Sequence, residues 1–381
     1  MPTDLIAYLT ARQEEMLADI GRLVALESPS REEAGVSAAA DQVAAWLAGL
    51  GAEVRRHPAP GYGTHLEARW PGGPDAGNRK PALLLAHLDT VHPLGTLARN
   101  PFRVEGDRAY GPGIADTKGG LVMGLYALRA LRDLGRPLPR PVVYLITCDE
   151  EVGSPTSRPR IEALAREAAY ALVLETAGPG GALKTARKGV AGYRLTVIGR
   201  AAHAGNDYFA GVSANLELAR LVQALHALSD PGTGTTVNVG VMAGGTRSNV
   251  VAERATAEVD VRFWTRAAAE AVDAAIRALR PAHPEARLEI TGGVNRWPLE
   301  RTPAVAELYE HARRLAAEFG YAVGEAAVGG ASDGNLTAGV GLPTLDGLGA
   351  AGAGIHTEGE YLEVSHLVPR TALIARLLET L

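Results

Sequence analysis

The feature that most constrains the fold is a set of three short apolar runs separated by segments of helical periodicity. The runs are Pro81–Ala86, Pro141–Thr147 and Tyr170–Leu174. Each is short, apolar and followed closely by polar residues, which predicts a strand buried on both faces. Between the first two, Gly119–Leu134 carries apolar residues at helical spacing. Strands that alternate with helices predict a mostly parallel sheet covered by helices on both faces.

A different order of elements occupies the middle of the chain. The predicted elements are strand Tyr193–Gly199, helix Val212–Leu228, strand Thr235–Met242, strand Ala255–Phe263, helix Ala267–Leu279 and strand Ala286–Thr291. This βαββαβ order is that of ferredoxin-like domains. We therefore predict an α/β domain over residues 1–188 and 298–381, interrupted by a ferredoxin-like α+β module over residues 189–297. Further helices of the larger domain are predicted over Leu5–Leu26, Val36–Leu50, Pro303–Phe319 and His366–Leu378.

Bulk properties exclude several classes of protein. The chain has 381 residues, 46% of them hydrophobic and 21% charged, which is typical of a globular protein of two domains. The net charge of −5 gives no reason to expect nucleic acid or an anionic membrane as a partner. The N-terminus lacks the pattern of a signal peptide, and no apolar run approaches the ~18 residues of a membrane span, so we expect a cytoplasmic protein. Cys148 is the only cysteine, which excludes an internal disulfide and a cysteine-clustered zinc site.

Acidic and histidine side chains follow the ends of all three predicted strands. His87 and Asp89 follow the first, Asp149-Glu150-Glu151 follows the second, and Glu175 follows the third. Ligands bind beyond the carboxyl ends of strands in open α/β sheets, so these residues point to one place. Like charges as close as those of residues 149–151 repel one another, which indicates that a positive group lies nearby.

Histidine and carboxylate together are typical ligands of zinc. Two further residues fit such a site, Asp116 in a glycine-rich turn and His356 in a late loop. In a pair of metals ~3.5–4 Å apart, one carboxylate and an attacking water bridge both ions. One glutamate of the acidic run is then a ligand, and its neighbour is the base that takes a proton from the water.

The chain resembles the M20 family of metallopeptidases, and most closely its glutamate carboxypeptidase branch. The matching segments are His87–Val91, Pro101–Asp107, Tyr110–Gly120, Asp149–Ser154, Glu175, Ala202–Gly205, Ser248-Asn249, Asp260–Arg262, Gly329-Gly330 with Asp333, and His356. They occur in the family's order across nearly the whole chain, which makes the match highly specific.

The resemblance implies a site for two Zn²⁺ ions, with Co²⁺ or Mn²⁺ as substitutes. His87, Glu175 and Asp116 would hold one ion, and His356, Glu151 and Asp116 the other. His92 lacks the strand-end position of His87, and we do not predict it to be a ligand.

The resemblance also implies catalytic roles for three residues. Glu150 is the general base and then the general acid for the leaving amine. Asp89 orients the ring of His87. The inserted module is a lid and dimerisation domain, so the protein is expected to be a homodimer. In that dimer, His203 of the partner subunit stabilises the tetrahedral oxyanion.

The resemblance places the substrate's free carboxylate against Asn249 and Arg262, with Gly330 alongside. It implies a small peptide or an N-acyl amino acid as substrate, cleaved to release a C-terminal residue. Two segments, Lys184–Gly189 and Gly292–Pro298, do not reproduce the pattern of glutamate-specific members. The released residue therefore stays open.

Three alternatives to a carboxypeptidase differ in what the same residues would do. An N-acyl-amino-acid deacylase of the acetylornithine or succinyl-diaminopimelate type would use the same chemistry. A non-catalytic metal-binding protein could dispense with Glu150, which is present here. A nucleotide-binding protein is disfavoured because neither Gly111–Gly120 nor Gly329–Gly334 has the spacing of a phosphate loop or a dinucleotide fingerprint.

Overall fold

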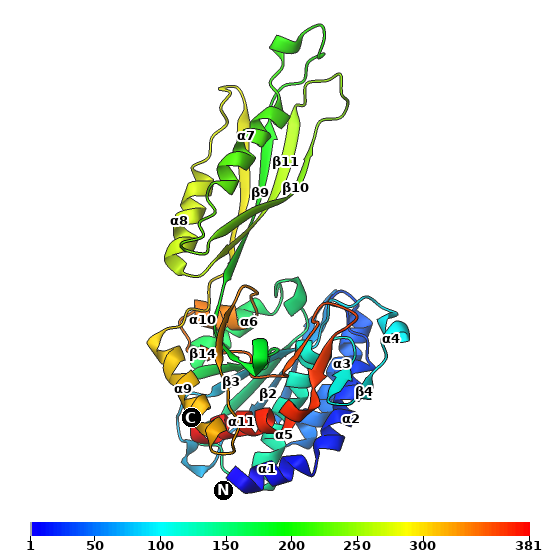
Figure 1. The fold of residues 1–381 in the computed structure, drawn as a ribbon, viewed down its shortest axis with the longest axis vertical. Helices are drawn as coiled ribbons and strands as arrows, with labels where there is room; N and C mark the ends of the chain where they lie inside the picture. The colour runs from blue at the N-terminus through cyan, green and yellow to red at the C-terminus, as the bar shows by residue number, and fades with distance from the viewer. Residues whose placement is uncertain (1) are drawn as a thin grey trace. The chain divides into compact units, whose positions relative to one another are not determined.

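The computed structural model describes residues 2–381, which fold into two compact units (Figure 1). The first unit runs to Ala186 and resumes over Arg301–Val328 and Ser332–Leu381. The second unit comprises Arg187–Glu300 and Gly329–Ala331. In residues 2–381 no helix has both the length and the apolar character needed to cross a lipid bilayer.

The main sheet of the first unit has six strands in the order β1-β2-β6-β3-β7-β14. These strands are β1 (Glu53–Ala59), β2 (Gly63–Trp70), β3 (Ala82–His87), β6 (Val142–Thr147), β7 (Tyr170–Val173) and β14 (Thr344–Leu345). β6, β3, β7 and β14 run parallel, as predicted, whereas β1 and β2 form an antiparallel hairpin beside β6. The sequence did not predict this hairpin, because β1 is largely exposed and β2 carries the polar His65 and Glu67 at buried positions.

Helices cover both faces of this sheet. One face packs against α1 (Pro2–Thr10), α2 (Gln13–Val24), α3 (Glu33–Gly49), α5 (Gly119–Asp133), α9 (Pro303–Ala317) and α11 (Leu367–Thr380). The other packs against α6 (Arg158–Glu167) and α10 (Gly334–Gly339) (Figure 1). Successive residues of β3 alternate between the two cores: Leu84 enters the larger and Leu83 and Leu85 the smaller. This double burial explains why the parallel strands are continuous apolar runs.

The single helix predicted over Leu5–Leu26 is in fact two, α1 and α2, which are separated near Arg12. Leu9 and Met16 lie on either side of the break and are both fully buried. They are seven residues apart, so the apolar periodicity continues across the break and conceals it.

Shorter elements complete the first unit. α4 (Thr96–Arg99) is a single turn, and a small antiparallel sheet has the order β15-β16-β5-β4. Its strands are β4 (Arg103–Glu105), β5 (Arg108–Tyr110), β15 (Gly352–Ala353) and β16 (Tyr361–Glu363), while β8 (Leu183–Arg187) pairs with β13 (Glu325–Val328).

The second unit is a four-stranded antiparallel sheet in the order β10-β11-β9-β12 with two helices on one face (Figure 1). Its elements are β9 (Gly189–Ile198), α7 (Ala214–His226), β10 (Thr236–Gly244), β11 (Arg254–Phe263), α8 (Arg266–Arg277) and β12 (Arg287–Arg296). Residues of β11 alternate strictly, with Ala257, Val259 and Val261 buried under the helices. The order is the ferredoxin-like arrangement predicted from the sequence.

Candidate metal centre

The polar residues that follow the strands meet at one edge of the main sheet. β3 ends at His87, Glu150 and Glu151 follow β6, and Glu175 follows β7. β6, β3 and β7 are parallel neighbours, so their carboxyl ends lie side by side. His87, Glu150 and Glu175 are all buried.

Asp116 lies between two imidazoles. It sits in the turn Ile114–Lys118 that leads into α5, and the peptide bond after it is cis. Its Oδ1 is 3.1 Å from Nε2 of His87, and its Oδ2 is 3.3 Å from Nε2 of His356. The two carboxylate oxygens therefore face different histidines.

Each histidine also meets one further carboxylate. Nε2 of His87 is 3.3 Å from Oε1 of Glu175, and Nε2 of His356 is 3.4 Å from Oε2 of Glu151. The donor atoms thus form two groups of three that share Asp116. One donor atom each from His87, Asp116 and Glu151 lies within 4.8 Å of the others, a spacing that suits a metal ion. Because His87 belongs to the first group and Glu151 to the second, the two groups adjoin each other.

His356 reaches the site from an exposed turn. Its backbone has φ +64, a left-handed conformation that is uncommon for a residue other than glycine, and its side chain is 51% exposed. Such strained backbone conformations cluster at functional sites, where they hold a side chain in a required orientation.

The electrostatics of the site favour a cation. Hydrogen bonds to Asp116 and Glu151 raise the pKa of His356 to about 10. Burial opposes the charging of His87, yet its hydrogen bonds to Asp116, Asp89 and Glu175 raise its pKa well above the usual value. Burial, in turn, raises the pKa of Glu151. Imidazole and carboxylate ligands gathered in so negative a pocket fit a divalent metal of the zinc type.

Asp89 contacts both His87 and the turn that carries Glu150 and Glu151. His87 Nδ1 is 2.9 Å from the backbone oxygen of Asp89, which turns Nε2 toward Asp116 and Glu175. The Asp89 carboxylate accepts hydrogen bonds from the backbone N–H groups of Glu150 and Glu151, each at 3.1 Å. The turn that carries these two glutamates is therefore held against the strand end that carries His87.

The carboxylate of Asp149 faces away from the other two acids of its run. It accepts hydrogen bonds from the backbone N–H and the hydroxyl of both Thr156 and Ser157. Glu150 and Glu151 are thus the members of the acidic run that remain for the site. The sequence does not show that Asp149 differs in this way from Glu150 and Glu151, because the three acids are adjacent.

Several residues that no sequence motif marks also support the site. Ser30 donates a hydrogen bond of 2.7 Å to Asp89. His65 is buried, and its Nδ1 is 3.2 Å from Cys148 Sγ and accepts a hydrogen bond from the Cys148 N–H. Burial raises the pKa of the Cys148 thiol, which therefore stays protonated and is no nucleophile. These contacts join residues that are far apart in the sequence, and no local motif marks them. The sequence therefore did not predict them.

The remaining predicted residues belong to the second unit: His203, Asn249, Arg262 and Gly330. His203 is exposed and lies beside Asn249, whose carbonyl accepts a hydrogen bond from the N–H of Ala204. Arg262 makes a bidentate ion pair with Asp260 two residues before it on β11, at 2.8 and 2.9 Å. The carbonyl of Gly330 accepts a hydrogen bond from Arg187.

Residues 83–380 match the peptidase family M20/M25/M40 over the strand ends, the Asp116 turn and the His356 loop described above. The chain belongs to this family. M20 proteins are metal-dependent hydrolases, which agrees with the donor set of the site.

Known M20 proteins resemble the chain over nearly its full length. It is 32% identical to carboxypeptidase G2 of Pseudomonas sp. (strain RS-16) over 98% of this chain and 91% of that protein. It is 29% identical to a succinyl-diaminopimelate desuccinylase of Rhodospirillum centenum, over 90% and 91% of the two chains. The crystal structure of aminopeptidase PepT from Bacillus cereus superposes with a TM-score of 0.79 and 25% identity, over 96% of this chain and 98% of that one. The M20 fold is thus common to relatives with different substrates.

Proposed function

We propose that the protein is a dinuclear zinc exopeptidase that hydrolyses the amide bond to a C-terminal amino acid. The observation that carries the proposal is the carboxylate of Asp116, whose two oxygens face His87 and His356 separately. With two ions bound, Asp116 would be a ligand of both, His87 and Glu175 would complete one ligand set, and His356 and Glu151 would complete the other.

When bound, the metals supply Lewis-acid polarisation of the scissile carbonyl and lower the pKa of the attacking water. Glu150 is the base that takes the proton from this water and passes it to the leaving amine. Its backbone is anchored by Asp89 next to the ligand Glu151, which holds the base beside the ligand set. His203 of the partner subunit stabilises the tetrahedral oxyanion, and Asn249 and Arg262 bind the substrate's free carboxylate. For Arg262 this requires that the substrate share or displace Asp260, its present partner.

A second candidate is an N-acyl-amino-acid deacylase, supported by the similarity to the succinyl-diaminopimelate desuccinylase over 90% of this chain. The ligand set and the base serve both reactions, because each cleaves an amide next to a carboxylate. The two differ only in what is recognised on either side of the bond.

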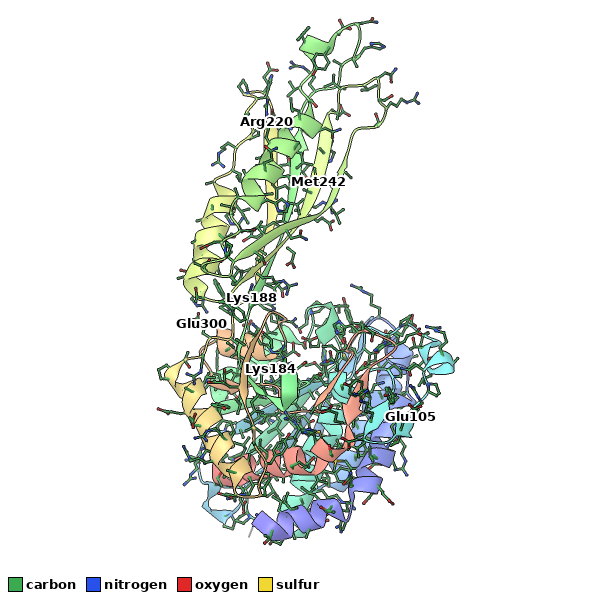
Figure 2. The ribbon with its side chains drawn as sticks, viewed as in Figure 1. Glu105, Lys184, Lys188, Arg220, Met242 and Glu300 are labelled. Carbon is green, nitrogen blue, oxygen red and sulfur yellow. The ribbon has the colours of Figure 1, made fainter. Side chains whose placement is uncertain are left out.

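The homodimer proposed from the family resemblance has a suitable surface in the second unit. β10 is an edge strand, and its Val241 and Met242 are 55% and 51% exposed (Figure 2 labels Met242). Leu216 on α7, which packs beside β10, is 49% exposed, and Phe209 in the preceding loop is 97% exposed. An open strand edge flanked by exposed apolar side chains is a favourable surface for pairing with a second copy.

The proposed function is tested by amide hydrolysis with zinc-loaded and chelator-treated protein. The panel contains dipeptides and N-acyl amino acids with acidic, neutral and basic C-terminal residues, and the released amino acid is quantified. Zinc-dependent release of a C-terminal residue from the dipeptides supports the carboxypeptidase; release of glutamate or aspartate supports its glutamate type, whereas release favouring neutral or basic residues excludes only the glutamate specificity. Activity confined to N-acetyl or N-succinyl diamino acids supports the deacylase. No hydrolysis of any substrate by the zinc-loaded protein contradicts both.

A further inference from the structure

Glu360 is a fully buried acid that the proposed reaction leaves without a role. It lies between the His356 turn and β16, and its side chain is 0% exposed. A charged side chain is almost never buried so completely unless its charge is compensated. Its partners therefore indicate what it does.

Four hydrogen-bond donors to the Glu360 carboxylate lie in loops of the metal centre, and the buried ammonium group of Lys118 adds a favourable charge interaction. Oε1 accepts hydrogen bonds from the N–H groups of Ala115 at 2.8 Å and Asp116 at 3.0 Å. Oε2 accepts one from the N–H of Gly113 at 2.9 Å and one from Nε2 of His92 at 2.7 Å. An ionised carboxylate offers about four lone-pair sites, so these four donors occupy all the acceptor sites of Glu360.

Three of these four donors are backbone groups of the turn that carries Asp116. Gly113, which precedes this turn, has φ +71, and a Cβ there would lie 2.4 Å from Thr90 Cγ2, so a larger residue would be strained at this position. The N–H groups of residues 113, 115 and 116 converge on one carboxylate. These three hydrogen bonds tie the backbone of the turn to the Glu360 carboxylate.

The same carboxylate joins three loops that each carry a residue of the centre. His92 follows His87 and Asp89, the second loop contains Asp116, and Glu360 itself is four residues after His356. The main chain adds to this link, since Tyr361 pairs with Tyr110 in the small sheet. A shift of Glu360 would therefore move Asp116 relative to His356.

We propose that Glu360 is a positioning residue that, together with His92, fixes the backbone of Asp116 relative to His356 and so sets the metal affinity of the centre. The proposal deepens the proposed function and rests on its metal centre. It is tested by a measurement on the metal-free protein that does not require catalysis.

The informative substitution is Glu360→Gln, which preserves the size of the side chain but not its four acceptor sites. The amide nitrogen of glutamine would face an N–H donor in place of an acceptor oxygen. We expect amide hydrogen exchange of residues 113–116 in the metal-free variant to be faster by about tenfold or more. We expect zinc affinity, measured against a chromophoric chelator, to fall by about 10- to 100-fold. At saturating zinc, kcat should fall while KM stays unchanged.

Glu358→Gln is the matched control. Glu358 is two residues away in the same loop, but it is 58% exposed and pairs with the surface residue Arg99 at 2.8 Å. This variant should match the wild type in exchange, zinc affinity and kcat. His92→Phe removes one of the four hydrogen bonds and should give an effect in the same direction as Glu360→Gln but smaller.

Two results would overturn the proposal. One is wild-type exchange at residues 113–116 together with wild-type zinc affinity in Glu360→Gln. The other is faster exchange throughout the first unit, for instance in β6, which would make Glu360 a general stabiliser. If the local exchange and zinc results appear but the wild type cleaves nothing in the substrate panel, the positioning role stands and the proposed function fails.

Discussion

The ring of His87 is held by the backbone of Asp89, not chiefly by its carboxylate. Nδ1 is 2.9 Å from the carbonyl oxygen of Asp89 and 3.5 Å from its Oδ1. The carboxylate is instead engaged by Ser30 and by the N–H groups of Glu150 and Glu151. Its main structural effect is therefore on the proposed base and the ligand beside it.

Asp89→Asn should accordingly impair the base more than the orientation of His87. The amide retains one acceptor oxygen where three donors now converge, so the turn at Glu150 and Glu151 loses part of its anchor. We expect kcat/KM and zinc affinity to fall by about 10- to 100-fold. Ser30→Ala removes only one of the three donors and should lower kcat/KM and zinc affinity by less than Asp89→Asn does. Equal losses in the two variants would contradict this assignment.

Glu150→Gln should abolish turnover without loss of metal. Removal of a general base costs about 10²- to 10⁴-fold in rate. Zinc content, measured by elemental analysis after gel filtration, should equal that of the wild type. Glu151→Gln is the contrasting variant, because it should lose both activity and metal. Substantial turnover by Glu150→Gln would exclude it as the base.

Met242→Glu should convert the proposed dimer to monomers, because it places a charge among the exposed apolar side chains of the edge strand β10. Sedimentation velocity measures the change. Thr291→Glu, on the opposite edge strand β12, is the control and should leave the dimer intact. A wild-type protein that is already monomeric at micromolar concentration would refute the dimer itself.

The cross-subunit role of His203 is open to a complementation test. His203→Ala should lower kcat by about 10²- to 10³-fold with little change in KM, as loss of an oxyanion donor does. An equal mixture of His203→Ala and Glu150→Gln chains, allowed to exchange subunits, should recover about one quarter of wild-type activity. The reason is that each heterodimer of a two-fold dimer then contains one complete site. No recovery in a mixture shown to contain heterodimers would place His203 in its own subunit's site.

The ionised carboxylate of Glu67 should stabilise the folded protein near neutral pH but not in acid. Its buried carboxylate on β2 meets Arg160 at 2.5 Å, Arg69 at 2.7 Å and His57 at 3.1 Å. Burial opposes its ionisation, but the hydrogen bonds from Arg69 and Arg160 lower its pKa below the usual 4.5. A lowered pKa in the folded state stabilises the protein above about pH 4.5, and this contribution is lost as the pH falls through the folded value.

Glu67→Gln should therefore reduce the free energy of unfolding by about 1–3 kcal/mol at pH 7, since hydrogen bonds to a charged group are removed. The difference between variant and wild type should shrink as the pH falls below 4.5. Thermal unfolding at a series of pH values measures both. A difference that is constant with pH would show that the charge of Glu67 is not responsible.

The sequence alone was sufficient to predict the layered α/β domain, the ferredoxin-like module and the residues that meet at the sheet edge. The physical reason is local. A strand buried on both faces must be apolar, so its end is visible where His87, Glu150 or Glu175 appears. Parallel strands then bring these ends together wherever they occur in the chain.

The tertiary structure alone decided which of these residues touch and what supports them. Asp116 faces both histidines, Asp149 turns away from its neighbours, and Arg262 is engaged by Asp260. Glu360 reaches His92 across 268 residues and Ser30 reaches Asp89 across 59. Such contacts depend on the three-dimensional course of loops, and no periodicity or spacing along the chain records which distant donor a buried carboxylate will meet.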